Sequence, residues 1–162
     1  MRSWLLDGPD RENLRAVGAD GAQQGRQMND WNRQVIDEFR ANQGKVAQFG
    51  DAPLVILHTI GAKSGQLREI PLVALDEDGV LTVFASKAGA PDNPDWYYNL
   101  KSTPEITVEY GTDRFSARLD ELDPAEASAR IGRQAQIMPQ FGEYVTKAAP
   151  RIIPAFEIVR LG

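Results

Sequence analysis

Residues 53–75, PLVILHTIGAKSGQLREIPLVAL, contain the two strand-like runs and the loop that decide the fold. The first run, residues 54–59, is apolar, of strand length and rich in β-favouring side chains, and the second run covers residues 69–75. The loop between them holds Gly61 and Gly65 and is too short to contain a helix. The segment therefore predicts a β-hairpin rather than a β–α–β unit.

Four further runs of strand length follow along the chain. The six predicted strands are residues 54–59, 69–75, 80–86, 105–110, 114–119 and 155–160. Residues 76–79 and 111–113 are short, turn-forming links, so neighbouring strands are expected to pair in antiparallel fashion. Closing such a sheet into a barrel removes exposed strand edges. The predicted fold class is therefore α+β, a closed or nearly closed, mostly antiparallel barrel with flanking helices.

Helical patterns occur on both sides of the predicted strands. Trp31, Val35, Ile36 and Phe39 follow the spacing of one helix face from Asn29 onward, and a glycine follows the expected end near residue 42. Three more helices are predicted over residues 94–100, 124–136 and 141–147. The first two begin at a proline that follows capping residues, which is typical of helix starts.

A single folded domain is the simplest interpretation of 162 residues, and no repeat or low-complexity linker divides them. Residues 1–27 are rich in Gly, Gln, Asp and Arg and show little periodicity, so they are predicted to form a flexible N-terminal arm. The remaining residues, 28–162, are expected to form the barrel domain.

The composition excludes several classes of function. With a formal net charge of −5 and a pI near 4.9, the chain would be repelled by nucleic-acid phosphates, so nucleic-acid binding is not expected. The absence of cysteine excludes disulfides, thiolate nucleophiles and iron–sulfur clusters. No stretch reaches the roughly 18 apolar residues of a membrane span, and the N-terminus lacks a signal-peptide core. The chain is therefore expected to be cytoplasmic.

Two loops place a lysine beside glycine and serine at a strand end: GAKSGQLR, residues 61–68, and ASKAGAP, residues 85–91. Glycine lets backbone N–H groups approach an oxyanion, serine adds a hydroxyl donor, and Lys63, Arg68 and Lys87 supply positive charge. The loops predict a site for a phosphate-bearing ligand, although the first also fits a simple hairpin turn. A Walker A loop is excluded, because it would require glycine at positions 57 and 62.

Several chemistry-bearing residues have simpler structural interpretations. His58 lies within an apolar strand and is interpreted as a core or edge histidine rather than a catalytic base. Trp96 and Tyr97 fit core aromatic residues as well as they fit the wall of a ligand site. Acidic residues between positions 120 and 126 precede a predicted helix, where carboxylates favour the N-terminal dipole. No metal-binding constellation is apparent in the sequence.

Five segments, taken in order, form a more specific pattern. They are VIDEFRAN (residues 35–42), the loop Gly61-x-Lys63-Ser64-Gly65-x-x-Arg68, PLV (71–73), Ala85-Ser86-Lys87-x-Gly89-Ala90-Pro91, and Pro94-x-Trp96-Tyr97-x-Asn99-Leu100. From about Asn29 to the C-terminus, the chain resembles the deazaflavin-dependent nitroreductase family, oxidoreductases that use the deazaflavin coenzyme F420. The resemblance implies a six-stranded, mostly antiparallel split β-barrel of the FMN-binding split-barrel-like type.

The resemblance also implies which residues would serve the coenzyme F420. The expected coenzyme-binding residues are Lys63, Ser64, Gly65, Arg68, Pro71, Ala85, Ser86, Lys87, Gly89, Pro91, Trp96 and Asn99. The cations and Ser64 would hold the phosphate and the acidic tail, and the segment from residue 85 to residue 99 would cradle the ring. Tyr144 is the expected catalytic residue, as a proton donor. Two positions depart from the family pattern, which often has a basic residue at Ala62 and a tyrosine at Phe141.

The activity implied by the resemblance is hydride transfer from reduced F420 to a small-molecule acceptor, such as a quinone, an activated alkene or a nitroaromatic. Two alternatives stay open. One is a non-catalytic protein that binds the coenzyme or another planar ligand, because a fold does not settle function. The other is an FMN-dependent oxidoreductase, whose single phosphate would also suit Lys63 and Arg68. The oligomeric state is open as well, with a homodimer among the candidates.

Overall fold

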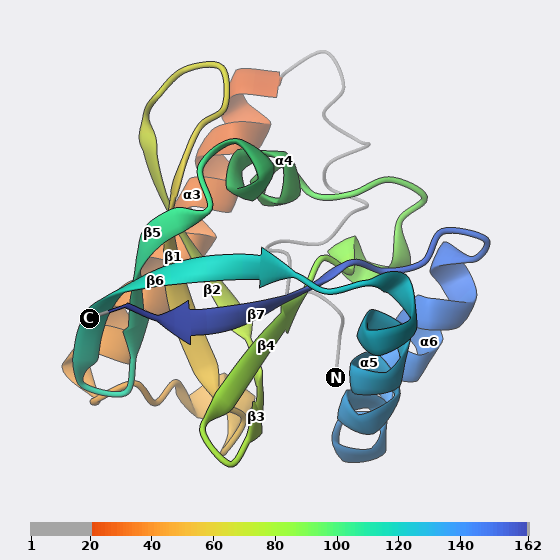
Figure 1. Cartoon of the computed structure of the whole chain (residues 1–162). Helices are drawn as coiled ribbons and strands as arrows, with labels where there is room; N and C mark the ends of the chain where they lie inside the picture. The colour runs from red at the N-terminus through yellow and green to blue at the C-terminus, as the bar shows by residue number, and fades with distance from the viewer. Residues whose placement is uncertain (1–20, 162) are drawn as a thin grey trace.

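The computed structural model describes residues 21–161, with side chains described from Asp30 onward. A curled antiparallel sheet forms the centre of the molecule, and the helices lie around it (Figure 1). Its strands are β1 (Leu54–Ile60), β2 (Leu67–Val73), β3 (Leu75–Glu77), β4 (Val80–Phe84), β5 (Glu105–Tyr110), β6 (Asp113–Glu121) and β7 (Ala155–Arg160). The helices are α3 (Gly21–Ala41), α4 (Asp95–Ser102), α5 (Pro124–Ile137) and α6 (Gln140–Ala148), with 3-10 turns η2 (Ala47–Phe49) and η3 (Lys87–Gly89).

The sheet is curled because its two edge strands are neighbours in the chain. The strand order is β2-β1-β5-β6-β7-β4-β3, and every pair is antiparallel. Strands β2 and β3 form the two edges, yet only Ala74 separates them. Since the two Cα–Cα steps from Val73 to Leu75 span at most about 7 Å, the edges must approach each other. The structure is a curled half-barrel, which confirms the predicted α+β, antiparallel class.

The predicted count of six strands was wrong, because the link at residues 76–79 is itself part of a hairpin. Leu75–Glu77 forms the additional strand β3, and Glu77 pairs with Val80. The turn needs only Asp78 and Gly79, which have φ values of 55° and 90°. Two residues with positive φ form the tight turn that matches the twist of the flanking strands. The acidic, turn-like composition of the link concealed this short strand.

Strand β1 is buried on both of its faces. Its residues from Leu54 to Thr59 are all buried, and successive side chains point to opposite faces. Leu54 and Ile56 join the core cluster that also contains residues of α3, α5 and α6. Val55 and Leu57 join the second cluster, which is formed mainly by the other face of the sheet and by α4. Burial on both faces explains why this strand is a continuous apolar run rather than an alternating one.

Helix α3 packs along β2 through one apolar face. Val35, Ile36 and Phe39 are buried, as the predicted spacing requires. The helix begins at Gly21, earlier than predicted, and ends where Gly44 donates its amide to the Phe39 carbonyl at 2.7 Å. Gly44 has a φ of 90°, the left-handed conformation that commonly terminates helices. Residues 1–20 of the predicted arm lie outside the described residues.

The three shorter helices lie close to their predicted positions. Helices α5 and α6 lie side by side at one end of the sheet (Figure 1). The carboxylate of Asp123 accepts the amide of Glu126 at 2.9 Å, so this acidic residue caps α5 as expected. Helix α4 begins at Asp95, one residue later than predicted. Within residues 21–161, no helix combines the length and the apolar character needed to cross a membrane.

Candidate functional site

The first glycine loop, residues 61–66, joins β1 to β2 as a compact turn. Gly61 donates its amide to the Gln66 carbonyl at 2.8 Å, and Gly65 donates to the Gly61 carbonyl at 2.9 Å. The hydroxyl of Ser64 accepts the Gln66 amide at 3.1 Å. A Cβ added to Gly61 would lie 2.5 Å from that hydroxyl, so the turn closes only around glycine. Ser64 therefore holds the loop together, in addition to its expected contact with an anion.

The cations of this loop are available for a ligand. Lys63 and Arg68 are both exposed, and within the described part of the chain neither has a carboxylate at ion-pair distance. Surface cations that lack such neighbours keep their full charge for an incoming anion. The interpretation of this loop as an anion site is thus compatible with its geometry, whereas Pro71 lies elsewhere. Pro71 is buried in β2 opposite Ile56, five residues and about 17 Å along the strand from the loop.

Helix α4 fixes the first loop from one side. The buried amide oxygen of Asn99 accepts the Ala62 amide at 2.9 Å. Trp96 and Leu100 share the buried face of α4 with Asn99. The Trp96 ring packs against Phe156 in the core, with centroids 6.1 Å apart. Its buried indole N–H has no hydrogen-bond partner among the described residues, so it remains a donor without an acceptor.

The second loop, residues 85–91, follows β4 and has an unusual backbone. Ser86 is right-handed helical, with φ −74° and ψ −39°, and three left-handed residues follow. Lys87, Ala88 and Gly89 have φ values of 48°, 56° and 82°. Lys87 and Ala88 are not glycine, so their positive φ values strain the backbone. Such strain persists mainly where a functional site requires it. The change from right-handed to left-handed backbone is the geometry in which successive N–H groups converge on an anion.

Helix α6 packs directly on this second loop. A Cβ added to Gly89 would lie 2.9 Å from Lys147 Cβ and 3.1 Å from the Tyr144 carbonyl oxygen. Gly89 therefore permits the close approach that brings Tyr144 beside the loop. Tyr144 is 3% exposed and packs edge-on against Phe141, with centroids 5.3 Å apart. The aliphatic part of Lys147 also lies over the loop, and sequence reasoning did not identify this cation.

Lys87 has a partner within its own loop. Its ammonium lies 3.2 Å from an Asp92 carboxylate oxygen, and this hydrogen bond lowers the pKa of Asp92. Ala85 and Ser86 are fully buried behind Lys87, while Pro91 is exposed at the end of the loop. The expected site residues thus fall into two groups. One group surrounds the 61–68 segment and Asn99, and the other is the 85–91 loop with Tyr144.

Arg151 is the main residue that sequence reasoning missed. It precedes β7, and its guanidinium donates to the carbonyl oxygens of Ala85, Ser86 and Ala90 and to the side chain of Asn93. These bonds hold the second loop from behind. One signal was present in the sequence: the acidic residues nearest to Arg151 are six or more positions away, so its partners had to come from a distant segment.

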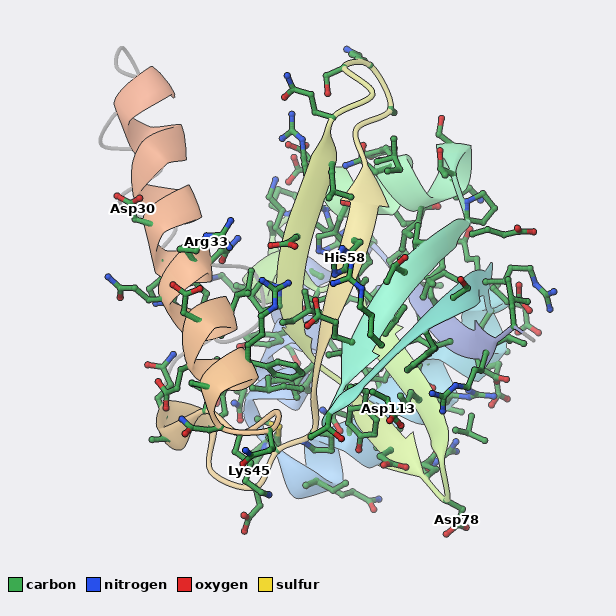
Figure 2. All side chains as sticks on the ribbon, turned by 90° about the vertical axis from the view of Figure 1, so that its left-hand side faces the viewer. Asp30, Arg33, Lys45, His58, Asp78 and Asp113 are labelled. Atoms are coloured by element: carbon green, nitrogen blue, oxygen red, sulfur yellow. The ribbon has the colours of Figure 1, made fainter. Side chains whose placement is uncertain are left out.

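A separate charge cluster joins α3 to the sheet. His58 is 4% exposed and lies 2.7 Å from a Glu109 carboxylate oxygen, and Arg40 donates to both Glu109 and Glu69. The hydrogen bonds from Arg40 are the main reason that the pKa of Glu109 falls to about 2. In Figure 2 Arg33 lies on α3 and His58 on the sheet that faces it. The interpretation of His58 as a core residue therefore holds, with a partner distant in sequence.

The same cluster is the one potential metal-binding group among the described residues. Ligand atoms of His58, Glu69 and Glu109 lie within 4.8 Å of one another, which the sequence did not reveal because the three positions are far apart. Arg40 nevertheless donates to both carboxylates, at 2.6 Å and 3.0 Å. The guanidinium takes the place that a metal cation would need, so the cluster acts as a structural ion-pair network.

Comparisons with known proteins agree on one family of reductases. A family model described as F420H(2)-dependent quinone reductase matches residues 31–157. The F420H(2)-dependent quinone reductase Rv1261c of Mycobacterium tuberculosis is 33% identical over 88 residues, which are 53% of this chain and 59% of that protein. The chain thus spans less than two thirds of the length of the curated relatives that it matches.

Two solved structures are similar over most of their own length. One, an F420-H2 dependent reductase (FDR-A), is 36% identical with a TM-score of 0.58, and the match covers 65% of this chain and 93% of that chain. The other, described as a domain-swapped dimer, is 33% identical with a TM-score of 0.60, and the match covers 80% of this chain and 97% of that chain. Both TM-scores exceed 0.5, which indicates the same overall fold.

Proposed function

Because the chain belongs to the F420H(2)-dependent quinone reductase family, we propose that it uses F420H2 to reduce a small quinone-type acceptor. The observation that carries this proposal is the strained 86–89 backbone lying against α6 beside Tyr144. Strain of this kind is retained where it prepares a binding site. Activated alkenes and nitroaromatics belong to the same class of electrophilic acceptor and are included in the proposal.

The residues present fit an anionic, planar coenzyme. Lys63 and Arg68 are exposed cations without a carboxylate partner among the described residues, which suits a phosphate and an acidic tail. The right-handed to left-handed turn at Ser86 and Lys87 suits the polar edge of a ring or a phosphate. Glycine at position 89 lets this loop lie directly against α6, because a Cβ there would overlap Lys147 and the Tyr144 carbonyl. Trp96 and Asn99 would support the site from the core, and Ala85 and Pro91 would flank the loop.

In the proposed mechanism, the bound coenzyme supplies a hydride, and the protein positions the two reactants. Lys63 and Arg68 bind the anionic end, while the 86–89 segment orients the other end through backbone donors. Burial at the loop–helix contact excludes water from the reacting region. Tyr144 is the proposed proton donor to the reduced acceptor, because its ring lies on the helix that covers the loop.

The proposal also covers features that accompany this activity. We place the reaction in the cytoplasm and assign residues 28–162 to one split-barrel domain preceded by an arm. We further propose a homodimer, which is supported by a similar chain whose solved structure is described as a domain-swapped dimer. Size-exclusion chromatography with light scattering would measure the assembly.

The direct test is a parallel titration of the purified protein with oxidised F420 and with FMN, followed by tryptophan fluorescence. Menadione is then added to the reduced complex, and oxidation of the reduced coenzyme is measured by its absorbance. We expect selective F420 binding and acceptor-dependent oxidation. Binding without turnover would indicate a carrier, and preferential FMN binding would indicate a flavin enzyme. Binding of neither compound would mean that the two loops are structural.

A further inference from the structure

We infer that Arg151 is a positioning residue for the coenzyme site, and that it acts by fixing the direction of the Ser86 and Lys87 backbone N–H groups. This role rests on the proposed function for the identity of the ligand, but its structural basis stands on the contacts of Arg151 alone. No family pattern in the sequence pointed to this arginine.

The contacts of Arg151 are numerous and directed at one short segment. Nη1 donates to the Ala85 carbonyl at 3.1 Å and to the Asn93 side-chain oxygen at 2.6 Å. Nη2 donates to the carbonyls of Ser86 and Ala90, both at 2.8 Å, and Nε donates to Ala90 at 3.0 Å. These five bonds reach four oxygens, three of which are backbone carbonyls of residues 85–90, so the guanidinium holds the backbone of this segment.

The direction of these bonds determines where the opposite side of each peptide points. In a planar trans peptide, the C=O and the following N–H point in opposite directions. The carbonyls of Ala85 and Ser86 face Arg151, so the N–H groups of Ser86 and Lys87 face away from it. The Ala90 carbonyl precedes Pro91, which has no N–H, and therefore serves only as an anchor. Arg151 thus presents two donors on the far side of the loop.

The carbonyls that Arg151 binds belong to residues on both sides of the strained residues in the chain. Ala85 and Ser86 precede the left-handed residues Lys87 and Ala88, and Ala90 follows them. Side-chain-bearing residues rarely adopt this conformation without support from their surroundings. A planar guanidinium with five donors in fixed geometry can hold both ends of the segment at once, whereas a single ammonium cannot.

The charge of Arg151 adds a second effect. Arginine does not lose its proton in a protein, so a permanent positive charge lies behind the loop. Hydrogen bonds to the carbonyls polarise the same peptides and strengthen their N–H groups as donors. Lys87, by contrast, is paired with Asp92. An anionic group on the far side of the loop would therefore be bound largely by peptides that Arg151 holds and polarises.

The test compares Arg151→Met and Arg151→Lys with Arg133→Met, which removes an arginine bound to Glu77 on the exposed surface. Each full-length variant is titrated with oxidised F420, its thermal midpoint is measured, and hydrogen exchange is followed in the peptide covering residues 84–94. We expect Arg151→Met to raise the F420 Kd at least tenfold and to speed exchange of the Gly89 and Ala90 amides, which bond within this loop. Arg151→Lys should be intermediate, and Arg133→Met should match the wild type.

An Arg151→Met protein that is folded, binds F420 with wild-type affinity and keeps wild-type exchange in the loop would overturn the inference. If Arg151→Met does not fold, Arg151→Lys decides in its place: an unchanged Kd for that variant overturns the role of the guanidinium fork. A wild-type protein that binds no F420 overturns the proposed function instead. The exchange comparison needs no coenzyme, so it still decides whether Arg151 positions the loop.

Discussion

Arg40 and Glu109 are joined by two hydrogen bonds, Nε to Oε1 at 3.1 Å and Nη2 to Oε2 at 2.6 Å. The pair connects helix α3 to strand β5, and Glu109 is 9% exposed at its side chain. Because His58 Nε2 donates to the same carboxylate, one acidic residue links three elements of the fold. The stability of the α3–sheet contact should depend on this carboxylate remaining ionised and paired.

Replacing Arg40 tests the contribution of this pair at neutral pH. Arg40→Met should lower the free energy of unfolding by about 2–3 kcal/mol, because a nearly buried carboxylate loses its bidentate partner. Arg118→Met is a matched control, since Arg118 pairs with Asp120 on the exposed surface and its loss should leave the unfolding free energy close to that of the wild type. Urea denaturation at pH 7 measures both values. Equal losses in the two variants would contradict a special role for Arg40.

The pH dependence of stability provides a second test of the same pair. The pKa of Glu109 is lowered from 4.5 to about 2 in the folded protein, mainly by the hydrogen bonds from Arg40. Its stabilising contribution is therefore complete above pH 4.5 and is lost as the pH falls toward 2. The difference in stability between wild type and Arg40→Met should narrow over this range. A constant difference from pH 6 to pH 2.5 would exclude Glu109 as the responsible group.

Gly44 tests the backbone contact that ends α3. A Cβ at this position would lie 2.7 Å from Gly111 Cα, and φ is already 90°. Gly44→Ala should therefore lower the unfolding free energy by about 2–4 kcal/mol, through both strain and overlap. Gly79→Ala has the same φ of 90° but no atom within 4 Å, so it should cost only about 1 kcal/mol. Similar losses in Gly44→Ala and Gly79→Ala would show that the close approach of Gly44 to Gly111 can relax.

Lys63 tests the anion site in the first loop. Lys63→Met should weaken F420 binding about tenfold and reduce its dependence on salt, because one cation of the site is removed. Lys45→Met is the control, since Lys45 lies beyond the C-terminal end of α3, far from this loop (Figure 2). Fluorescence titrations at two salt concentrations measure both effects. Unchanged affinity in a folded Lys63→Met protein would remove this loop from the coenzyme site.

Tyr144 tests the proposed proton transfer. Tyr144→Phe keeps the ring that packs against Phe141 and removes only the hydroxyl, so kcat should fall about 100-fold while the F420 Kd stays within about twofold. Tyr98→Phe alters an exposed tyrosine on α4 and should leave kcat unchanged. Steady-state kinetics with menadione give kcat, and the titration gives Kd. A wild-type kcat in Tyr144→Phe would assign the proton to another group or to solvent.

Local patterns were sufficient to predict most elements of the fold. The apolar spacing of Val35, Ile36 and Phe39 indicated α3, and the glycine loop between two apolar runs indicated the β1–β2 hairpin. Strand β3 was missed because its three residues are largely acidic and are stabilised by pairing with β4 rather than by their own propensity. Short strands are decided by their partners, which local patterns do not contain.

Residues of the candidate site that belong to a short sequence motif could be predicted. Residues whose role depends on partners distant in the chain could not. Lys63, Lys87 and Asn99 were each identified by a motif whose own residues lie within a few positions of one another. Arg151 donates to residues about 60 positions away, and Glu109 lies 51 positions from His58. The strained backbone at Lys87 and Ala88 also left no sequence signal, because neither residue type favours positive φ.

The position of β7 in the sheet has a consequence for synthesis. Strand β7 pairs with β6 on one side and with β4 on the other, although it follows both by more than 30 residues. Before it emerges from the ribosome, β2-β1-β5-β6 and the β3–β4 hairpin form separate pieces, each with an unpaired edge that can aggregate. The second loop also depends on the segment that leads into β7, because the Ala85 amide donates to the Pro154 carbonyl. A nascent chain therefore completes its sheet and the candidate site in one late folding step.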